Sequence, residues 1–480
     1  MISAILFPVL AALGINIKAV RNSLTVLHKY VFCSVLLNSL ALLFLVFGPQ
    51  VRSLTLFAFT EKLPCILSCD GLSRVFIIII SVLWPLTALY SFEYMEHDGG
   101  ETRFFRFFLV SYGVCAGIAL AGNMVTMYIF FELLTLATLP LVMHKMDDNA
   151  RYAGKHYLIC SMIGASLGFI SIVFVQEYGS GAGFILGGIM PENMPAGFIR
   201  ELRTAFTLSF FGFGVKAALF PMSFWLPEAS VAPTPVTALL HAAAVVTAGA
   251  FACIRLTYYS FGTDILSGSF AQYIPMAAAV ITIVYGSVLA LRNRHLKRRL
   301  AWSTVANLSY ILFAVLLMTG AGLKAACLHM IAHAYIKCTL FFGAGCVMVS
   351  AGKEYLDEIG GLSKRLPVTF ACFTIASAAL MGVPPMPGFF SKWAIACAAG
   401  SGNWLEITGV AALMFSAFLT AIYLMTVVCR AYFSRDVQSG GTCILERPKM
   451  KGVQIVLCII IISMGILNRA VQAGLDSWLF

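Results

Sequence analysis

Seven ionisable side chains stand in apolar surroundings, and they are the residues of this sequence best suited to move protons. They are Glu132, Lys216, His241, His329, His333, Lys337 and Lys392. In the stretch FGVKAALFPMSFWLPEASVAPTP, residues 213–235, Lys216 lies in an apolar run that four prolines then interrupt. Carboxylates, amines and imidazoles bind and release protons, and apolar surroundings make their charge costly. The set therefore points to proton transfer.

The histidines and lysine of HMIAHAYIKCTLFF are spaced four residues apart. On a helix, residues at this spacing lie on one face, about 6 Å from one another along the axis. His329, His333 and Lys337 therefore form one polar stripe that suits stepwise proton transfer through bridging water. Zinc binding also uses this histidine spacing, but no nearby segment supplies the further Cys or carboxylate ligands. Histidines that only pack and hydrogen-bond to neighbouring helices are the other alternative.

Glu132 is the natural counter-charge for Lys216. A buried ammonium group needs such a partner or must lose its proton. If the pair closes, Lys216 stays protonated, and if it opens, the proton becomes labile. A permanent ion pair that joins two helices is the alternative, although buried pairs seldom gain much stability.

The composition predicts that membrane helices hold these groups. The 480 residues are 60% hydrophobic and 11% charged, with a mean hydropathy of +0.90. Apolar runs of about 18 to 25 residues recur along the chain, and each is long enough to cross a bilayer as a helix. We predict an all-α, polytopic protein of about fourteen spans. They lie near 2–19, 30–48, 71–92, 107–122, 124–143, 156–176, 204–221, 236–257, 271–291, 301–319, 324–350, 367–398, 405–429 and 453–472. An ionisable group inside such a span is a functional candidate.

Two spans, the seventh and the twelfth, are predicted to be broken helices. The breaks are PMSFWLPEASVAPTP and GVPPMPGFF, and each lies close to a lysine. Broken helices survive in membranes only where they line water or are buried in protein. Their separation by five spans suggests two inverted five-helix repeats, although Lys216 precedes its break and Lys392 follows its own. We therefore predict four parts of the chain. Residues 1–106 form an N-terminal three-helix segment, and residues 107–258 and 259–430 form the first and second repeats. Residues 431–480 form a cytoplasmic linker and the last helix.

The formal net charge of +11 reflects topology and not nucleic-acid binding. Most linker Lys and Arg follow odd-numbered spans, so the positive-inside rule places those linkers in the cytoplasm and both termini outside. The cysteines are scattered and form no metal or cluster motif, and the chain has no phosphate-binding loop or dinucleotide fingerprint. We therefore expect no metal and no cofactor in this chain.

The motifs together resemble the antiporter-like subunits of respiratory complex I, energy-converting membrane-bound hydrogenases and Mrp-type cation/proton antiporters. The resemblance covers nearly all spans. It is carried by FGVKAALFPMSFWLPEASVAPTPVTALLHAAAVVTAGAF, RRLAWSTVANLSYILFAV, HMIAHAYIKCTLFFGAG and PPMPGFFSKW, in the family's order. The combination of two motifs, ALLHAAAVVTAG and FFSK, is most similar to the pattern of the largest complex I antiporter-like subunit and the large Mrp subunit.

The resemblance implies a role for each candidate residue. Glu132 resembles the family's helix-5 glutamate, and Lys216 resembles its helix-7 lysine. His241 resembles a histidine that some members carry in helix 8. The connecting residues of helix 11 are matched by His329, His333 and Lys337, and the helix-12 lysine is matched by Lys392. Other branches place a lysine in helix 8, where this chain reads VVTAG. The long lateral helix of the largest complex I relative has no counterpart here, which favours a compact hydrogenase-like or Mrp-like assembly.

The leading functional hypothesis is a proton- or Na⁺-translocating subunit of a membrane redox complex, with no redox chemistry in this chain. The alternatives are a subunit of a stand-alone Mrp-type Na⁺/H⁺ antiporter and a purely structural scaffold. The expected partners are the lipid bilayer and other membrane subunits, including a second antiporter-like or small membrane subunit. The expected location is a bacterial or archaeal-type cell membrane.

Overall fold

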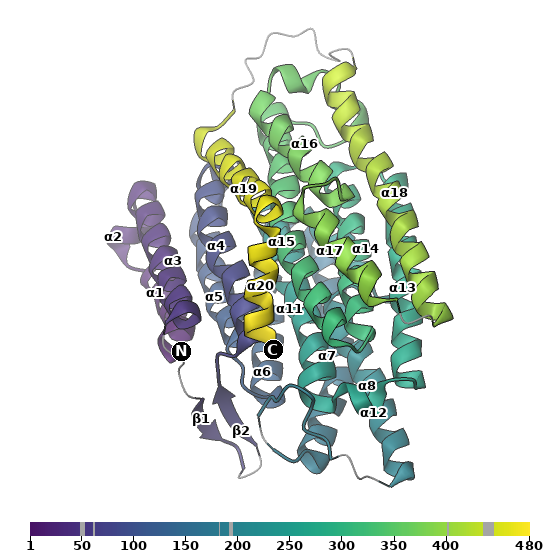
Figure 1. The fold of residues 1–480 in the computed structure, drawn as a ribbon. Coiled ribbons are helices and arrows are strands. Elements are labelled where there is room, and N and C mark those ends of the chain that lie inside the picture. Colours follow the sequence, from purple (N-terminus) through teal and green to yellow (C-terminus); the bar gives the residue numbers. More distant parts are fainter. Residues whose placement is uncertain (49–52, 61–62, 182, 192–194, 401–402, 435–445) are drawn as a thin grey trace.

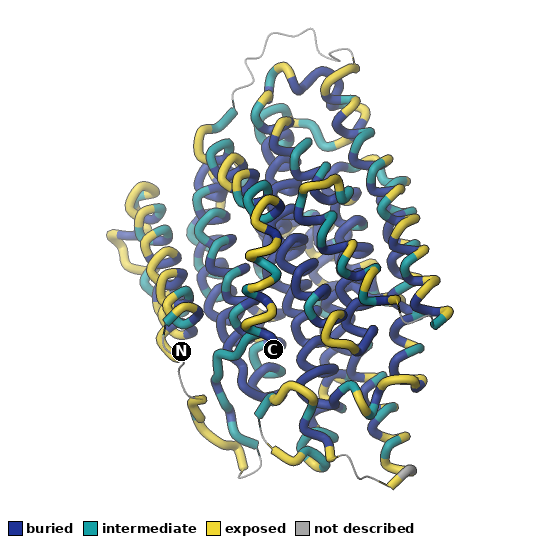
Figure 2. The backbone as a smooth tube through the Cα atoms, in the orientation of Figure 1, coloured by how far each residue is buried: buried dark blue, intermediate teal, exposed yellow. Residues whose placement is uncertain are grey.

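The computed structural model is a bundle of long helices with a buried interior (Figures 1 and 2). It describes residues 1–480 except 49–52, 61–62, 182, 192–194, 401–402 and 435–445. Bulky apolar side chains fill the space between the helices, while exposed apolar side chains cover much of the outside. This distribution is the one that a lipid environment requires.

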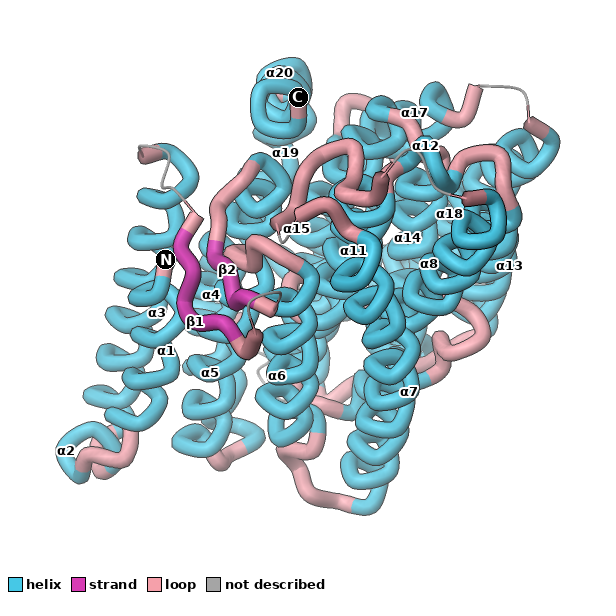
Figure 3. The backbone as a smooth tube through the Cα atoms, turned by 90° about the horizontal axis from the view of Figure 1, so that it is seen from below, coloured by secondary structure: helices cyan, strands magenta, loops and turns pink. Residues whose placement is uncertain are grey.

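The first part of the chain contains three helices beside the main bundle, a hairpin, and three further helices. They are α1 (Ile2–Gly14), α2 (Lys18–Arg21), α3 (Leu24–Phe47), β1 (Leu54–Ala58), β2 (Pro64–Leu67), α4 (Gly71–Asp98), α5 (Glu101–Ala119) and α6 (Met124–Val142). The antiparallel hairpin was not expected from the sequence. It lies below the helix ends (Figures 1 and 3), and an irregularity between Thr55 and Phe57 shifts its register.

The central part of the chain carries the first break. Its elements are α7 (Asp148–Tyr178), α8 (Ala196–Lys216), α9 (Trp225–Glu228), the 3₁₀ turn η1 (Ala229–Val231), α10 (Thr234–Ala242), α11 (Val245–Ile254), the π-helical segment η2 (Arg255–Phe261) and α12 (Thr263–Leu266). The predicted break after Lys216 is confirmed. The span predicted over 236–257 falls on the candidate membrane span Thr234–Phe261, within which the helix is interrupted at Ala243 and Ala244.

The last part of the chain carries the second break. Its elements are α13 (Phe270–Arg292), α14 (Leu296–Leu316), α15 (Gly320–Ala351), η3 (Leu356–Glu358), η4 (Leu362–Lys364), α16 (Pro367–Met381), α17 (Pro387–Ala398), α18 (Trp404–Phe433), α19 (Pro448–Ile466) and α20 (Asn468–Leu479). The predicted break between 382 and 390 is confirmed between α16 and α17. The final predicted span, 453–472, is divided at Leu467 into α19 and α20.

The protein is an all-α, multi-pass membrane protein. Ten helices among the described residues are long and apolar enough to cross a membrane, and Ile2–Gly14 and Pro367–Met381 are shorter apolar helices. Each of the fourteen predicted spans falls on one or two helices, but the number of crossings stays a prediction. The four-part division of the chain and its inverted repeats stay predictions as well.

Candidate functional site

Glu132 and Lys216 form the predicted ion pair between α6 and α8. The Lys216 ammonium Nζ donates to Glu132 Oε1 at 3.2 Å, and it also donates to the Phe131 carbonyl. Nζ lies 3.6 Å from the centroid of the Phe131 ring, a cation–π distance. The Lys216 side chain is 1% exposed and that of Glu132 is 27% exposed. The cation is therefore enclosed, whereas its counter-ion lies at the edge of the bundle and can turn away.

Lys216 is also the last residue of α8, so the helix break fixes its position. The indole Nε1 of Trp225, from beyond the break, donates to the Val215 carbonyl at 2.8 Å and caps the helix end. The C-terminal end of a helix carries partial negative charge, which favours a nearby cation. The break thus places an ammonium group at the negative end of a half-helix inside the bundle.

Lys392 occupies the corresponding place at the second break. It belongs to α17, after the break, but its Nζ reaches back and donates to the carbonyls of Leu380 at 2.6 Å and Met381 at 3.2 Å. These carbonyls end α16, which stops at Gly382 with φ of 94°, a conformation that glycine tolerates. The Lys392 ammonium group therefore lies at the C-terminal end of the first half-helix, whereas Lys216 is the last residue of its half-helix and its ammonium group is held by α6.

The predicted stripe on α15 is present. The ring centroids of His329 and His333 are 6.3 Å apart. His329 Nδ1 lies 2.9 Å from the Ser391 hydroxyl on α17. Lys337 Nζ donates to the Leu300 carbonyl at 3.0 Å and to the Ser303 hydroxyl, both on α14. The stripe therefore connects α14 with the helix that carries Lys392.

His241 lies at the unexpected interruption between α10 and α11. Its ring packs against Phe341 of α15 at 4.7 Å between centroids. It is fully buried, yet neither ring nitrogen has a hydrogen-bond partner among the described residues. Thr247 donates its hydroxyl to the Ala242 carbonyl at 2.8 Å and so provides a hydrogen bond for one backbone group at the interruption. A buried imidazole with two open nitrogens is suited to contact with water.

One further buried lysine, Lys297, was missed because it belongs to the basic run RNRHLKRR and was assigned to a linker. It lies in the first turn of α14, is 4% exposed, and donates its Nζ to the Ala232 carbonyl at 2.9 Å. The signal available in the sequence was helical spacing, because Ala301 and Val305 follow at four-residue intervals and are also buried. Lys297 therefore joins the candidate residues.

The structure brings the ionisable residues together in two groups. The first is the Glu132–Lys216 pair. In the second group, His241 lies within electrostatic range of Lys297 and Lys337. His333 lies within electrostatic range of His241, His329 and Lys337. Lys392 lies within electrostatic range of His329 and Lys337. Among the described residues, no direct hydrogen bond joins two members of the second group. Transfer along it therefore requires bridging water.

Arg255, which is fully buried, and Asp70, whose side chain is 32% exposed, form a second ion pair that the sequence did not indicate. The Arg255 guanidinium binds both carboxylate oxygens of Asp70, donates to Ser73 Oγ at 3.0 Å, and lies over the rings of Phe184 and Tyr259 at 4.7 and 4.6 Å. Burial alone would raise the pKa of the Asp70 carboxyl, but Arg255 and the hydrogen bonds from Ser73 together outweigh burial and hold the pKa below its ordinary value. The pair thus stabilises the fold at pH values above the ordinary pKa of a carboxyl group. That stabilisation is lost as the pH falls through the lowered pKa.

Replacing Arg255 with methionine is expected to lower the free energy of unfolding by about 1–3 kcal/mol, because the partly exposed Asp70 carboxylate loses its charged hydrogen-bond partner. Adding Asp70→Asn removes the charge and keeps the acceptor that caps Ser73 N at 2.9 Å. The double variant should therefore recover part of the loss. Thermal unfolding in detergent measures the stability of the single and the double variant. Equal instability of the single and double variants would contradict an electrostatic origin.

The described residues contain no group of three or more His, Cys, Asp or Glu placed to hold a metal ion. The geometry instead gives ammonium and imidazole groups held by carbonyls, hydroxyls and aromatic rings at helix breaks. Such a site can bind, hold and pass a proton.

Comparison with known proteins places this arrangement in a family. Residues 121–420 match the family described as "NADH:quinone oxidoreductase/Mrp antiporter, TM", and residues 61–105 match "NADH-Ubiquinone oxidoreductase (complex I), chain 5 N-terminus". The chain belongs to the NADH:quinone oxidoreductase/Mrp antiporter family of membrane subunits. The resemblance inferred from the sequence motifs is therefore confirmed.

Curated relatives and solved structures agree with this assignment. The chain is 32% identical over 425 residues to NADH-quinone oxidoreductase subunit L of Mycobacterium tuberculosis, covering 86% of this chain and 64% of that protein. It is 30% identical over 447 residues to the chloroplastic NAD(P)H-quinone oxidoreductase subunit 5 of Piper cenocladum, covering 88% and 58%. The chain thus spans about three fifths of the length of these relatives, which are subunits of multi-subunit complexes.

Two solved structures share the fold over almost the whole chain. A chain of the membrane-bound sulfane sulfur reductase, an archaeal respiratory membrane complex, superposes with a TM-score of 0.85 at 22% identity, covering 99% of this chain and 96% of the other. A chain of the Mrp complex from Dietzia sp. superposes with a TM-score of 0.81 at 18% identity, with the same coverage.

Proposed function

We propose that this chain is the proton-translocating subunit of a membrane redox complex, of the quinone oxidoreductase or hydrogenase type. Electron transfer takes place in partner subunits, and this chain moves the ion. The observation that carries the proposal is the alignment of Lys297, His241, Lys337, His333, His329 and Lys392 within electrostatic range through the bundle interior. The coupling ion is H⁺, with Na⁺ as the alternative.

The proposed mechanism begins at the Glu132–Lys216 pair. When the half-exposed Glu132 turns away, the ammonium group of Lys216 loses its counter-charge and gives up its proton more readily. The proton passes through water to the second group and leaves on the Lys392 side. A second antiporter-like or small membrane subunit beside Glu132 would drive the opening.

The remaining proposals concern location and assembly. The chain lies in a bacterial or archaeal-type cell membrane, with both termini on the outer face. In Figure 1 both termini lie in the half of the molecule that carries the hairpin. A stand-alone Mrp-type Na⁺/H⁺ antiporter subunit is the second candidate, supported by the likeness of fold to the Mrp complex.

Purification of the tagged chain with its native partners distinguishes the two candidates. The proposal expects copurifying redox subunits and, in proteoliposomes with a pH-sensitive dye, acidification that requires electron transfer. An imposed Na⁺ gradient alone should move no protons. Proton movement driven by Na⁺ alone, without redox subunits, would favour the antiporter instead.

A further inference from the structure

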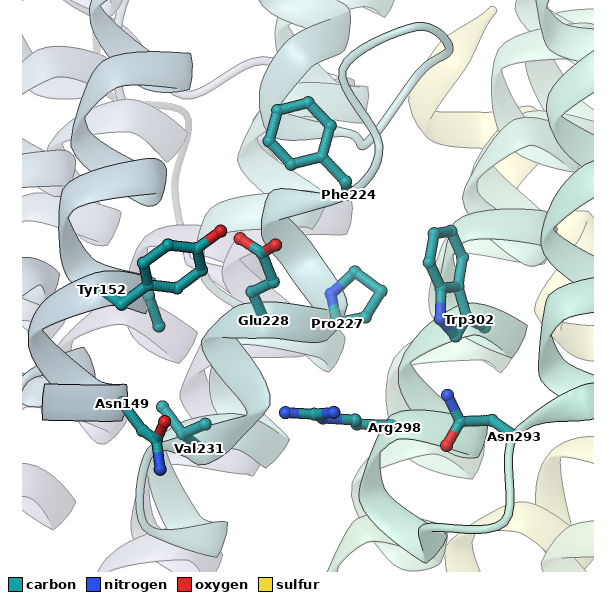
Figure 4. A pocket seen from close by; sticks show the side chains of 10 residues that line it. Asn149, Tyr152, Phe224, Pro227, Glu228, Val231, Asn293, Arg298 and Trp302 are labelled. Carbon is teal, nitrogen blue, oxygen red and sulfur yellow. The ribbon is translucent and has the colours of Figure 1, made fainter.

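A polar pocket opens where the first broken helix resumes. It has a volume of about 330 Å³ and lies between α7, the segment that contains α9 and η1, and the start of α14. Its lining includes Tyr152, Glu228, Arg298 and Trp302, and Figure 4 shows the Tyr152 hydroxyl directed toward the Glu228 carboxylate. None of the seven residues singled out in the sequence lines this pocket.

Glu228 is held in the pocket by one strong hydrogen bond. Its Oε2 lies 2.6 Å from His156 Nδ1 on α7, and the two side chains are 31% and 27% exposed. A carboxylate that is half-buried beside an imidazole and lines a pocket open at the protein surface can accept a proton from bulk water. The Arg298 side chain extends into the same pocket and supplies positive charge (Figure 4).

A second pocket adjoins the first. It has a volume of about 260 Å³ and shares Asn149, Val231 and Arg298 with the first. Its lining includes the buried Lys297, which lies within electrostatic range of His241. The two pockets therefore share one wall, with the Glu228 carboxylate lining the first pocket and Lys297 lining the second.

We propose that these pockets are the ion entrance of the chain and that Glu228, positioned by His156, is its proton-loading residue. The Glu228 carboxylate takes a proton from bulk water and returns to the carboxylate form when water in the pockets carries the proton to the neutral amine of Lys297. The resulting ammonium group passes it to the ring of His241. This inference rests on the proposed function and adds the entrance to it.

The alternative is that Glu228 and His156 only join α9 to α7. A structural link of this kind depends on the hydrogen bond and not on the exchange of a proton. Glu228→Gln keeps an acceptor for His156 but cannot take up a proton from water. The variant therefore separates the two roles.

The test measures translocation by the intact complex in proteoliposomes. Glu228→Gln should slow translocation at least about tenfold, and Glu228→Asp should retain much of the rate. The control is Glu201→Gln, which changes an exposed glutamate on α8 outside both pockets. Equal rates for Glu228→Gln and Glu201→Gln, with normal assembly, would overturn the proposal.

Blocking the pocket gives an independent measurement if Glu228→Gln fails to assemble. Asn149→Cys places a thiol in the wall shared by the two pockets, and Arg292→Cys places one in an exposed position outside them. A bulky, membrane-impermeant maleimide should stop translocation in the first variant and leave the second unchanged. Continued translocation after complete labelling at 149 would exclude this entrance. If the unaltered complex moves no ion at all, the proposed function itself fails, which is a different result.

Discussion

Replacement of Lys216 with alanine is expected to reduce ion translocation at least about a hundredfold while leaving assembly intact. The ammonium group is the only described partner of Glu132 in an ion pair, and it is enclosed at the end of α8. Without it, opening of the pair releases no proton, so the first step is lost. Assembly should survive because Glu132 lies at the bundle edge, where it can reach solvent or a partner.

The matched control is Lys155→Ala, which removes an exposed lysine on α7. Translocation is measured as dye-reported acidification of proteoliposomes, and assembly is measured by size-exclusion chromatography of the complex. The control should retain full translocation. Unchanged translocation by Lys216→Ala would remove the Glu132–Lys216 pair from the mechanism.

Replacement of Lys337 with methionine is expected to have a comparable effect for a different reason. Lys337 lies between His241 and His333 in the line of groups that continues through His329 to Lys392, and neighbouring members of the line are within electrostatic range of each other. Methionine keeps the length and apolar stem of the side chain but cannot carry a proton. The line of groups is then interrupted in its middle, and a loss of at least about a hundredfold follows.

Lys324→Met is the matched control on the same helix. Lys324 forms a surface pair with Asp476 at 2.7 Å, and pairs of this kind contribute little to stability. The same proteoliposome assay should show full translocation for this variant. A similar loss for both lysines would indicate damage to α15 and not interruption of a proton route.

The residues that proved easiest to predict are those whose chemistry conflicts with lipid. Glu132 and Lys216 stand alone in apolar runs, so their pairing followed from the cost of burying each charge. The breaks near Lys216 and Lys392 followed from proline, which cannot continue a helix. The α15 stripe followed from its four-residue spacing.

The features that were missed depend on tertiary contacts. The interruption at Ala243 and Ala244 contains neither proline nor glycine, and the hydroxyl of Thr247 stabilises it from the next turn. Lys297 lies in a basic run that resembles a solvated linker. The burial of Arg255 depends on Asp70, which is distant in sequence. Such pairings cannot be inferred from local patterns alone.

The central claim is that water joins the two groups of ionisable residues through the interior of the bundle. A cryo-EM map of the intact complex, at a resolution that shows ordered water, tests this claim most directly. The account predicts density for water at both ring nitrogens of His241 and along the space between Lys216 and Lys337. A dry, closely packed apolar barrier between these lysines, with His241 contacted by carbon atoms alone, would contradict it.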